Sequence, residues 1–443
     1  MTKTPQMTAS SSLPASPAIP SLMRGGYSSA ALRNLLWLSA DKVVAVVLGL
    51  LVFGMIARHF GPGGAGQFSY GVAVLQTTLG LSLVCSSAAV LPRLCMLREG
   101  TAAAAVANVF AVRLAGSLTA AAVVAAYALV AIDDPMRRGV TLVMLACVPL
   151  LEPFQAFSAY WLSRNQNRLP VLARGSGLLA RLVVVMVALW AGAPTWVVAF
   201  AWLVEAVVSA SLQTANLRTV RPWHKLIGAV RAARAAPYFR YGIRFAAGLW
   251  MSHLFLRIDR LWLAERMDAH AFGLYATAMQ LVEVWLQVAM LLAGSMAPAF
   301  LYRAVRHSTR LRDHWRTLSL LAALGLAGLL GAYLFGPQLL SLVFGTPFAS
   351  GSGYLLAGFA AAVLFFVDQF VQISITGNNR PGLLACKWGA ACAVIVTTLA
   401  LATPRYGAYA GPLGVALGLL AGWLVVAIAG GMRLARRRRQ EGR

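Results

Sequence analysis

Ionisable side chains lie inside the apolar stretches of this 443-residue chain. An ionised residue at the centre of a bilayer costs about 2.5–3.5 kcal/mol on insertion scales, so each should face a water-filled cavity or a partner. The set comprises Asp41, Lys42, Arg113, Glu152, Arg181, Glu205, Arg244, Arg257, Asp259, Arg260, Glu283, Asp368 and Lys387. A chain that merely sat in lipid would not keep so many charges, and we expect them to line a transport path.

Helical spacing places amide and carboxyl groups on shared faces. Gln280, Glu283 and Gln287 lie at i, i+3 and i+7 of one predicted helix. Amides and acids together offer the donors and acceptors that hydroxyl-rich sugars need. The alternative is interhelical hydrogen bonding that only packs the helices, worth about 0.6 kcal/mol per contact. The predicted sugar-binding cavity comprises Gln76, Gln155, Gln280, Glu283, Gln287 and Gln372.

The buried cations suit an anionic ligand. A pyrophosphate carries two or more negative charges, and the planar guanidinium forks of arginine match it well. The residues predicted to bind such a group are Arg181, Arg113, Lys42, Arg257 and Arg260. Internal pairing is the alternative, for example of Asp259 with Arg244, or of Glu152 and Glu205 with Arg181. The side chains of Arg257 and Arg260 could also extend to the outer surface of the membrane, where their charges meet water.

Four buried acids could couple an ion to transport by changing protonation: Glu283, Asp368, Glu152 and Asp259. The membrane potential acting on the charges is an equal alternative. The six histidines are scattered, with no metal-ligand spacing and no arrangement for covalent catalysis. We therefore expect no metal, no cofactor and no enzymatic activity.

Twelve apolar stretches must position these groups. The chain is 59% hydrophobic and 12% charged, whereas a soluble domain usually carries about 25% charged residues. A helix needs roughly 20 apolar residues to cross about 30 Å of hydrocarbon. The predicted spans are 35–57, 70–91, 104–132, 139–162, 171–191, 194–214, 241–263, 272–301, 317–335, 354–375, 383–402 and 407–430. The sequence therefore predicts an all-α membrane protein with about twelve transmembrane helices.

The basic residues predict how the helices are oriented. Most of the 38 lysines and arginines lie in alternate gaps between the spans and in the tails. Because cytoplasmic loops carry an excess of Lys and Arg, both termini are expected in the cytoplasm. The net charge of +25 then marks topology, and no nucleic acid is expected as a partner. The terminal run RLARRRRQEGR is expected to contact anionic lipids of the inner leaflet.

The spans divide six and six, which predicts two parallel halves around a central cavity. An offset of 207 residues aligns Gly66 with Gly273, Phe68 with Tyr275, and Gln76 with Glu283. The predicted organisation is a disordered cytoplasmic tail (1–34), a first half (35–215), a basic cytoplasmic linker (216–240), a second half (241–430) and a basic tail (431–443).

Two regions of the chain, one at the start of each half, resemble a known family. The stretches LRNLLWLSADKV and ARHFGPGGAGQFSYGVAV are similar to the opening hairpin of Wzx-type polysaccharide flippases. The segment LRIDRLWLAERMDAHAFGLYATAMQLVE is similar to the start of their second half. The motifs are shared with lipid II flippases and with multidrug and toxin extruders of the same superfamily. The resemblance implies alternating-access transport of an undecaprenyl-pyrophosphate-linked oligosaccharide across a bacterial inner membrane, and polysaccharide-assembly proteins as possible partners.

Two other functions stay open. A drug/cation antiporter of the same superfamily would favour an acid-lined cavity, whereas the spans hold seven basic and six acidic residues. A membrane oligosaccharide polymerase or glycosyltransferase usually needs a large outer loop with acidic catalytic residues. The longest predicted outer loop, 336–353, has no charge, which argues against an enzyme.

Overall fold

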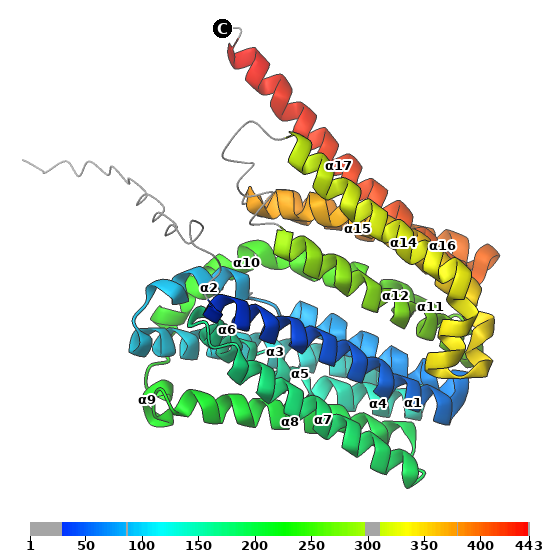
Figure 1. The fold of residues 1–443 in the computed structure, drawn as a ribbon, viewed down its shortest axis with the longest axis horizontal. Helices are drawn as coiled ribbons and strands as arrows, with labels where there is room; N and C mark the ends of the chain where they lie inside the picture. The colour runs from blue at the N-terminus through cyan, green and yellow to red at the C-terminus, as the bar shows by residue number, and fades with distance from the viewer. Residues whose placement is uncertain (1–28, 86, 297–310, 379, 442–443) are drawn as a thin grey trace, which may run out of the picture.

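The computed structural model describes residues 29–85, 87–296, 311–378 and 380–441, and these are almost entirely helical (Figure 1). Long helices lie side by side along one direction, as expected for a membrane bundle. The first half comprises α1 (Ser29–Leu81), α2 (Ser87–Met96), α3 (Glu99–Ala131), α4 (Pro135–Ala146), α5 (Val148–Leu151), α6 (Gln155–Ser163), α7 (Arg168–Trp190) and α8 (Thr195–Arg218).

A short connection follows, and then the second half. The connection holds the short helix α9 (Trp223–Ile227). The second half comprises α10 (Ala232–Phe255), α11 (Ile258–Leu263), α12 (Ala269–Met296), α14 (Leu311–Phe344), η2 (Thr346–Gly351), α15 (Ser352–Gly377), α16 (Pro381–Tyr406), η3 (Gly407–Tyr409) and α17 (Ala410–Glu441).

Nine helical stretches of the described chain are long and apolar enough to cross a membrane. Pro381–Met432 contains two of the predicted spans. Leu36–Leu81 covers the first predicted span and the beginning of the second, 70–91, whose helix ends at Leu81 before α2 begins at Ser87. Helices α10 and α11 occupy the predicted span 241–263, which holds the charged residues Arg244, Arg257, Asp259 and Arg260. Together these account for the twelve predicted crossings. The prediction of an all-α, multi-pass membrane protein is confirmed.

Four glycines turn the chain on the side that the charge pattern predicts to be outer, called the outer side below. Gly61, Gly192, Gly345 and Gly407 have φ of 68, 66, 109 and 55°. Residues with a Cβ rarely adopt this conformation, so glycine permits a reversal within very few residues. At Gly61 the two arms of α1 meet with almost no loop, and Pro62 begins the second arm. The predicted gap 58–69 is therefore mostly helical.

The fourth predicted span, 139–162, is not one helix. Three short helices, α4, α5 and α6, replace it. Pro149 and Pro153 lie at the breaks, and because proline lacks an N–H, it cannot continue the helical ladder. Glu152 lies in the second break and is buried. Cys147, Glu152 and Phe154 at the breaks keep right-handed helical dihedrals, so Pro135–Ser163 still forms one stretch long enough to cross the membrane.

Several predicted loops are helical. The predicted outer loop 336–353 consists of the end of α14, Gly345 and η2, and α17 extends through the predicted basic tail to Glu441. Helices α8 and α10 also enter the predicted linker 216–240 from either side. Apolar stretches locate the part of a helix that crosses hydrocarbon, and helices continue past it. Residues 1–28 of the predicted N-terminal tail lie outside the described residues.

The halves meet closely through glycines at repeat-equivalent positions. A Cβ on Gly66 would lie 3.0 Å from the Ala269 oxygen and 3.1 Å from the Gly273 nitrogen. A Cβ on Gly273 would lie 1.8 Å from the Pro62 oxygen. Since Pro62 and Ala269 are also 207 residues apart, the two contacts are reciprocal. Reciprocal contacts are what a twofold relation between two parallel halves produces.

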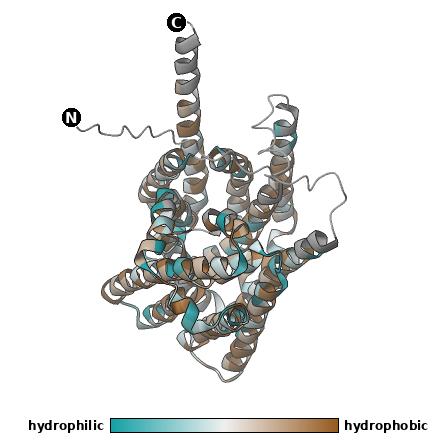
Figure 2. Ribbon diagram, turned by 90° about the vertical axis from the view of Figure 1, so that its left-hand side faces the viewer, coloured by the Kyte–Doolittle hydropathy of each residue, from teal (hydrophilic) through white to brown (hydrophobic). Residues whose placement is uncertain are grey.

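The charge-poor surface fits a lipid environment. Figure 2 shows hydrophobic stretches along many helices, with hydrophilic segments toward the middle of the view. Large apolar side chains are exposed on the long helices, among them Trp190, Leu342 and Leu401. Exposed apolar surface of this extent is stable only against lipid. The buried polar residues must therefore act within the protein interior.

Candidate functional site

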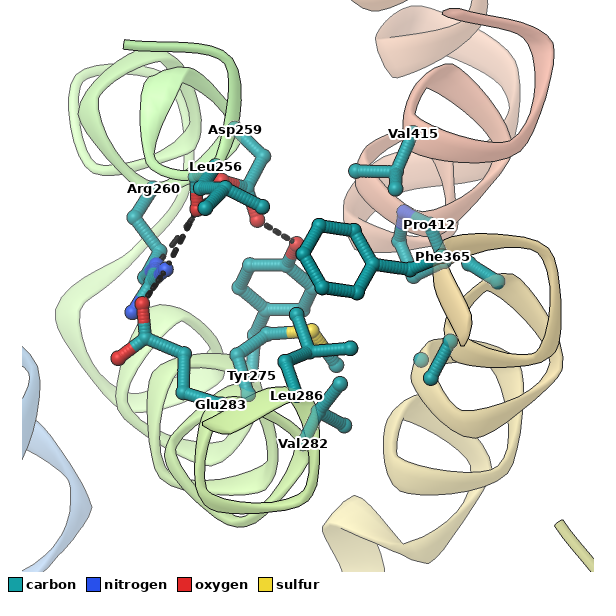
Figure 3. Close-up of a pocket in the computed structure, with 14 residues that line it drawn as sticks. Leu256, Asp259, Arg260, Tyr275, Val282, Glu283, Leu286, Phe365, Pro412 and Val415 are labelled. Atoms are coloured by element: carbon teal, nitrogen blue, oxygen red, sulfur yellow. Dashed lines mark hydrogen bonds and ion pairs between the residues drawn. The ribbon is translucent and has the colours of Figure 1, made fainter. Parts of the chain in front are cut away.

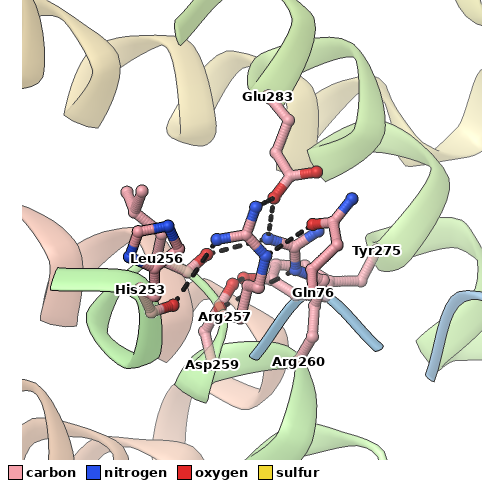
Figure 4. Close-up of polar contacts among 8 residues, drawn as sticks. All are labelled: Gln76, His253, Leu256, Arg257, Asp259, Arg260, Tyr275 and Glu283. Carbon is pink, nitrogen blue, oxygen red and sulfur yellow. Dashed lines mark hydrogen bonds and ion pairs between the residues drawn. The ribbon is translucent and has the colours of Figure 1, made fainter. Parts of the chain in front are cut away.

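A cluster of charged side chains lies where the second half begins. The chain breaks between α10 and α11 at Arg257, whose φ of −137° leaves the helical range. The break places Arg257 and Arg260 beside Glu283 of α12 (Figure 4). The Arg260 Nη2 to Glu283 Oε1 distance is 2.6 Å, and Arg257 Nη2 lies 3.7 Å from the same oxygen. One carboxylate thus serves two guanidinium groups.

The cluster also links the two halves. The Arg257 Nε donates a hydrogen bond to Gln76 Oε1 on the second arm of α1. Arg257 thus connects the first half to the carboxylate of the second. Because a hydrogen bond between repeat halves breaks when they separate, the Gln76–Arg257 contact reports their relative position. The structure brings five predicted site residues together here: Gln76, Arg257, Asp259, Arg260 and Glu283.

A second carboxylate completes the cluster and borders a cavity. The Tyr275 hydroxyl donates to Asp259 Oδ2, and Asp259 Oδ1 lies 3.9 Å from Arg260 Nε. The cavity has a volume of about 40 Å³, with polar groups on one side and apolar groups such as Phe365 and Val415 on the other (Figure 3). This space holds a few water molecules at most. A sugar can enter only after the helices move.

The cluster has no charged counterpart in the first half. Subtracting 207 from 259, 260 and 275 gives Val52, Phe53 and Phe68. These side chains are buried, and the Phe53 and Phe68 rings pack edge to face. The repeat-equivalent positions are thus apolar in the first half and charged or polar in the second. The offset of 207 residues carries the signal for this asymmetry, because it aligns the charged residues of the second half with apolar residues of the first.

The remaining buried charges form separate pairs. Arg113 Nη1 lies 3.4 Å from Glu152 Oε1, and both side chains are almost fully buried. Arg181 Nη1 lies 2.7 Å from Glu205 Oε2, and its guanidinium lies 4.5 Å from the Trp202 ring centre. The predicted alternative of internal pairing is therefore confirmed for Glu205 with Arg181. It is wrong for Glu152, whose partner is Arg113.

Asp368 of α15 and Lys387 of α16 form the most buried pair. The distance from Lys387 Nζ to Asp368 Oδ2 is 2.7 Å, and neither side chain is exposed. Asp368 Oδ1 accepts from the Trp423 indole at 2.8 Å. Gln372 Oε1 accepts from Lys387 at 3.4 Å and from the Trp388 indole at 3.0 Å. Every strong donor here has an acceptor, so the network holds α15, α16 and α17 together.

Other predicted site residues lie apart from the cluster. Lys42 is exposed and has no ion pair among the described residues, whereas its neighbour Asp41 pairs with Arg174 of α7 at 2.9 Å. Gln155 and Gln287 are exposed, and Gln280 is half-buried. The predicted pairing of Asp259 with Arg244 is not found, since Arg244 is exposed and Asp259 is buried against Tyr275.

Contacts across the halves hold the outer ends together. Arg137, at the start of α4, donates to the Ala264 oxygen at 3.0 Å and pairs with Glu265 at 3.2 Å. Its guanidinium also lies 5.0 Å from the Tyr70 ring centre. These contacts, which we call the outer latch, join the second outer connection of the first half to the start of the second half. Spacing carries no signal for this role, because Arg137 lies between the predicted spans 104–132 and 139–162.

Arg137→Ala is expected to loosen the outer side. Glu265 is substantially exposed, so the ion pair alone is worth at most about 1 kcal/mol. Loss of this interaction energy corresponds to a roughly fivefold larger equilibrium constant for opening of the outer side. Hydrogen–deuterium exchange of the peptides covering 132–140 and 264–270 measures it. Arg138→Ala, which alters the neighbouring arginine, should leave exchange unchanged. Equal exchange in both variants would show that the outer latch does not stabilise the contact between the outer ends of the two halves.

Known structures share this fold. No protein-family model matches the sequence, and no curated protein matches it. The structure titled lipid II flippase MurJ, in an inward closed conformation, has a TM-score of 0.67 at 10% identity, covering 90% of this chain and 87% of that chain. An inward-facing multidrug-resistance MATE transporter of the MOP superfamily has a TM-score of 0.62 at 15% identity, covering 92% and 99%. The eukaryotic MATE transporter AtDTX14 has a TM-score of 0.56 at 14% identity, covering 93% and 99%.

Proposed function

We propose that this protein is a transporter that flips an undecaprenyl-pyrophosphate-linked oligosaccharide across the bacterial inner membrane by alternating access. The fold it shares with a lipid II flippase and with MATE transporters supports a transporter. The observation that carries the proposal is the cluster of Gln76, Arg257, Arg260 and Glu283, which joins the two halves inside the membrane. Polar groups are retained at such a depth where a hydrophilic cargo passes.

The cluster suggests how an anionic headgroup is recognised. In the structure Glu283 acts as the internal counterion of Arg257 and Arg260. A pyrophosphate can take the place of this carboxylate, because arginine forks bind phosphate and carboxylate oxygens with the same geometry. Arg257 is the more available of the two, since its distance to Glu283 is 3.7 Å against 2.6 Å for Arg260. Displacement of Glu283 would also release the Gln76 contact and so link binding to movement of the halves.

The other residues predicted to bind the pyrophosphate or the sugar fit the proposal as follows. Arg113 and Arg181 would contact the pyrophosphate only after leaving Glu152 and Glu205. Lys42 is exposed and needs no such exchange. The sugar would contact Gln155, Gln280, Gln287 and Gln372 as well as Gln76 and Glu283, with the lipid tail in the bilayer.

Ion coupling is proposed to act through the paired acids Glu283, Asp368, Glu152 and Asp259. Each has a cationic or hydroxyl partner in the structure. Protonation of Glu283 would remove the counterion from two arginines and raise their attraction for an anion. We propose both termini in the cytoplasm, with anionic inner-leaflet lipids and polysaccharide-assembly proteins as partners.

Glu283→Ala and Arg257→Ala are expected to lower surface polysaccharide about tenfold, because each removes a charged hydrogen-bonding group worth roughly 1.5–3 kcal/mol. Arg181→Ala should also lower it. The measurement compares surface polysaccharide and the abundance of the transporter in cells lacking the native gene and carrying each variant. Thr397→Ala, which removes only a hydrogen bond within α16, is the matched control. Full polysaccharide from Glu283→Ala and Arg257→Ala at normal abundance would contradict the proposed site.

A drug/cation antiporter is the second candidate, favoured by the fold shared over 99% of the length of a MATE transporter. The same cells distinguish the two. A flippase requires that loss of the gene abolishes the polysaccharide and leaves drug susceptibility unchanged. Raised susceptibility to cationic drugs with intact polysaccharide would replace the flippase by the antiporter.

A further inference from the structure

A groove lies on α8, away from the charge cluster. Its floor follows Val207, Ser211, Thr214 and Arg218, at i, i+4, i+7 and i+11 on one face of the helix. Leu150 and Phe154 of the broken fourth span form the opposite wall. The groove has a volume of about 360 Å³. This is within the range of small-ligand sites.

The groove lies beside the interrupted part of the fourth span. Pro149 and Pro153 interrupt the helical hydrogen bonds there, next to Leu150 and Phe154, which border the groove. The small side chains of Ala210 and Ala215 leave room for the groove on this face of α8. The groove is therefore lined by residues of both α8 and the fourth span.

The length of the groove matches one leaflet of a bilayer. Val207 and Arg218 are eleven residues apart, which is roughly 16 Å along an α-helix. Half of the hydrocarbon thickness is about 15 Å. An apolar groove of this length, ending in a cation, has the shape of one acyl chain below its headgroup. The groove lies on the side of α8 opposite Glu205, so the substrate cluster and the Arg181 pair do not reach it.

The charge at the end of the groove selects an anion. Arg218 is exposed, and its guanidinium lies 5.7 Å from the Trp223 ring centre. Tryptophan and arginine beside each other are typical of the membrane–water interface. The chain from 206 to 258 contains no acidic residue. The nearby Arg221 already donates to the Gly100 oxygen at 2.8 Å, so Arg218 is the cation available at the groove.

We propose that this groove binds an anionic phospholipid of the inner leaflet, with one acyl chain against α8 and the phosphodiester on Arg218. The site is separate from the proposed transport function and stands if that function fails. A bound lipid would fill the space between α8 and the interrupted fourth span. Lipid composition would then affect the stability of the first half.

Native mass spectrometry of the full chain in detergent tests this, with dioleoylphosphatidylglycerol and dioleoylphosphatidylcholine as probes. Arg218→Gln is expected to weaken phosphatidylglycerol binding about tenfold, the loss of one charged hydrogen bond, and to leave phosphatidylcholine binding unchanged. Ser211→Phe, which fills the groove, should weaken binding of both lipids. Arg234→Gln, which removes an exposed arginine of α10 that does not line the groove, is the matched control.

Three results would overturn the proposal. The first is wild-type phosphatidylglycerol binding by Arg218→Gln. The second is an equal loss in Arg234→Gln, which would indicate diffuse attraction to a basic surface. The third is full competition by glycerol 3-phosphate, which would indicate a site for a soluble phosphate. Because Arg218 is exposed, its variant should fold normally, and an unchanged melting temperature verifies this.

Discussion

Gly273→Ala is expected to prevent the two halves from meeting as they do in this structure. The added Cβ would lie 1.8 Å from the Pro62 oxygen and 2.5 Å from its carbon, so backbone must move on one side. Overpacking of this kind costs typically 1–3 kcal/mol, and we expect about 3 kcal/mol or more here because no flexible side chain can yield. The measurement is the thermal unfolding midpoint in detergent, together with the yield of folded protein from membranes.

The same turn provides a matched control. Gly63→Ala alters a glycine three residues before Gly66, and its Cβ would have Ala269 Cβ at 4.0 Å as its nearest neighbour. This substitution should leave the midpoint almost unchanged. Gly66→Ala should have an intermediate effect, since its contacts of 3.0 and 3.1 Å require only small shifts. A Gly273→Ala protein as stable as Gly63→Ala would show that the halves do not pack through this pair.

Lys387→Met is expected to destabilise the second half by about 3–5 kcal/mol. The ammonium and the Asp368 carboxylate are both fully buried. Removing one partner of a buried pair leaves an uncompensated charge, which is the most costly way to break it. Trp423 would still donate to Asp368, but one neutral donor does not replace an ammonium. Thermal unfolding of the purified protein measures the loss.

Two comparisons separate the buried charge from the loss of the side chain. Asp368→Leu combined with Lys387→Met removes both charges and should recover most of the stability, because well-packed apolar residues often replace a buried pair without loss. Arg174→Met breaks the pair with Asp41, but the Arg174 side chain is 43% exposed, and the cost should not exceed about 1 kcal/mol. Equal destabilisation by Lys387→Met and Arg174→Met would contradict the assigned role of burial.

Most of the architecture could be predicted from the sequence, because membrane crossing leaves a strong signal. The spans needed only hydropathy and length, and the structure confirms their type. The helix ends could not be predicted in the same way. Hydropathy falls at the membrane surface, whereas α14 and α17 continue beyond it and the gap around Gly61 closes to one residue. Pro149 and Pro153 did carry a local signal for the broken fourth span.

The partners of the buried charges were less accessible to prediction. Sequence spacing shows which side chains share a helix face, but the rotation of one helix against another is set by packing across the bundle. Asp259 pairs with Tyr275, and Glu152 with Arg113. Neither followed from spacing, since both partners lie on other helices. The Gly66–Gly273 contact was accessible, because two positions related by a twofold repeat can meet only at the axis.

The glycine turns have a consequence for what can reach this protein from outside the cell membrane. Four of its outer reversals are made at Gly61, Gly192, Gly345 and Gly407, so few residues project there. An antibody or a protease binds most readily to chain that protrudes from a surface. An epitope inserted at one of these four reversals would strain a backbone that only glycine adopts comfortably. A protein that binds on that side would therefore have to contact the helix ends and the short connections between them.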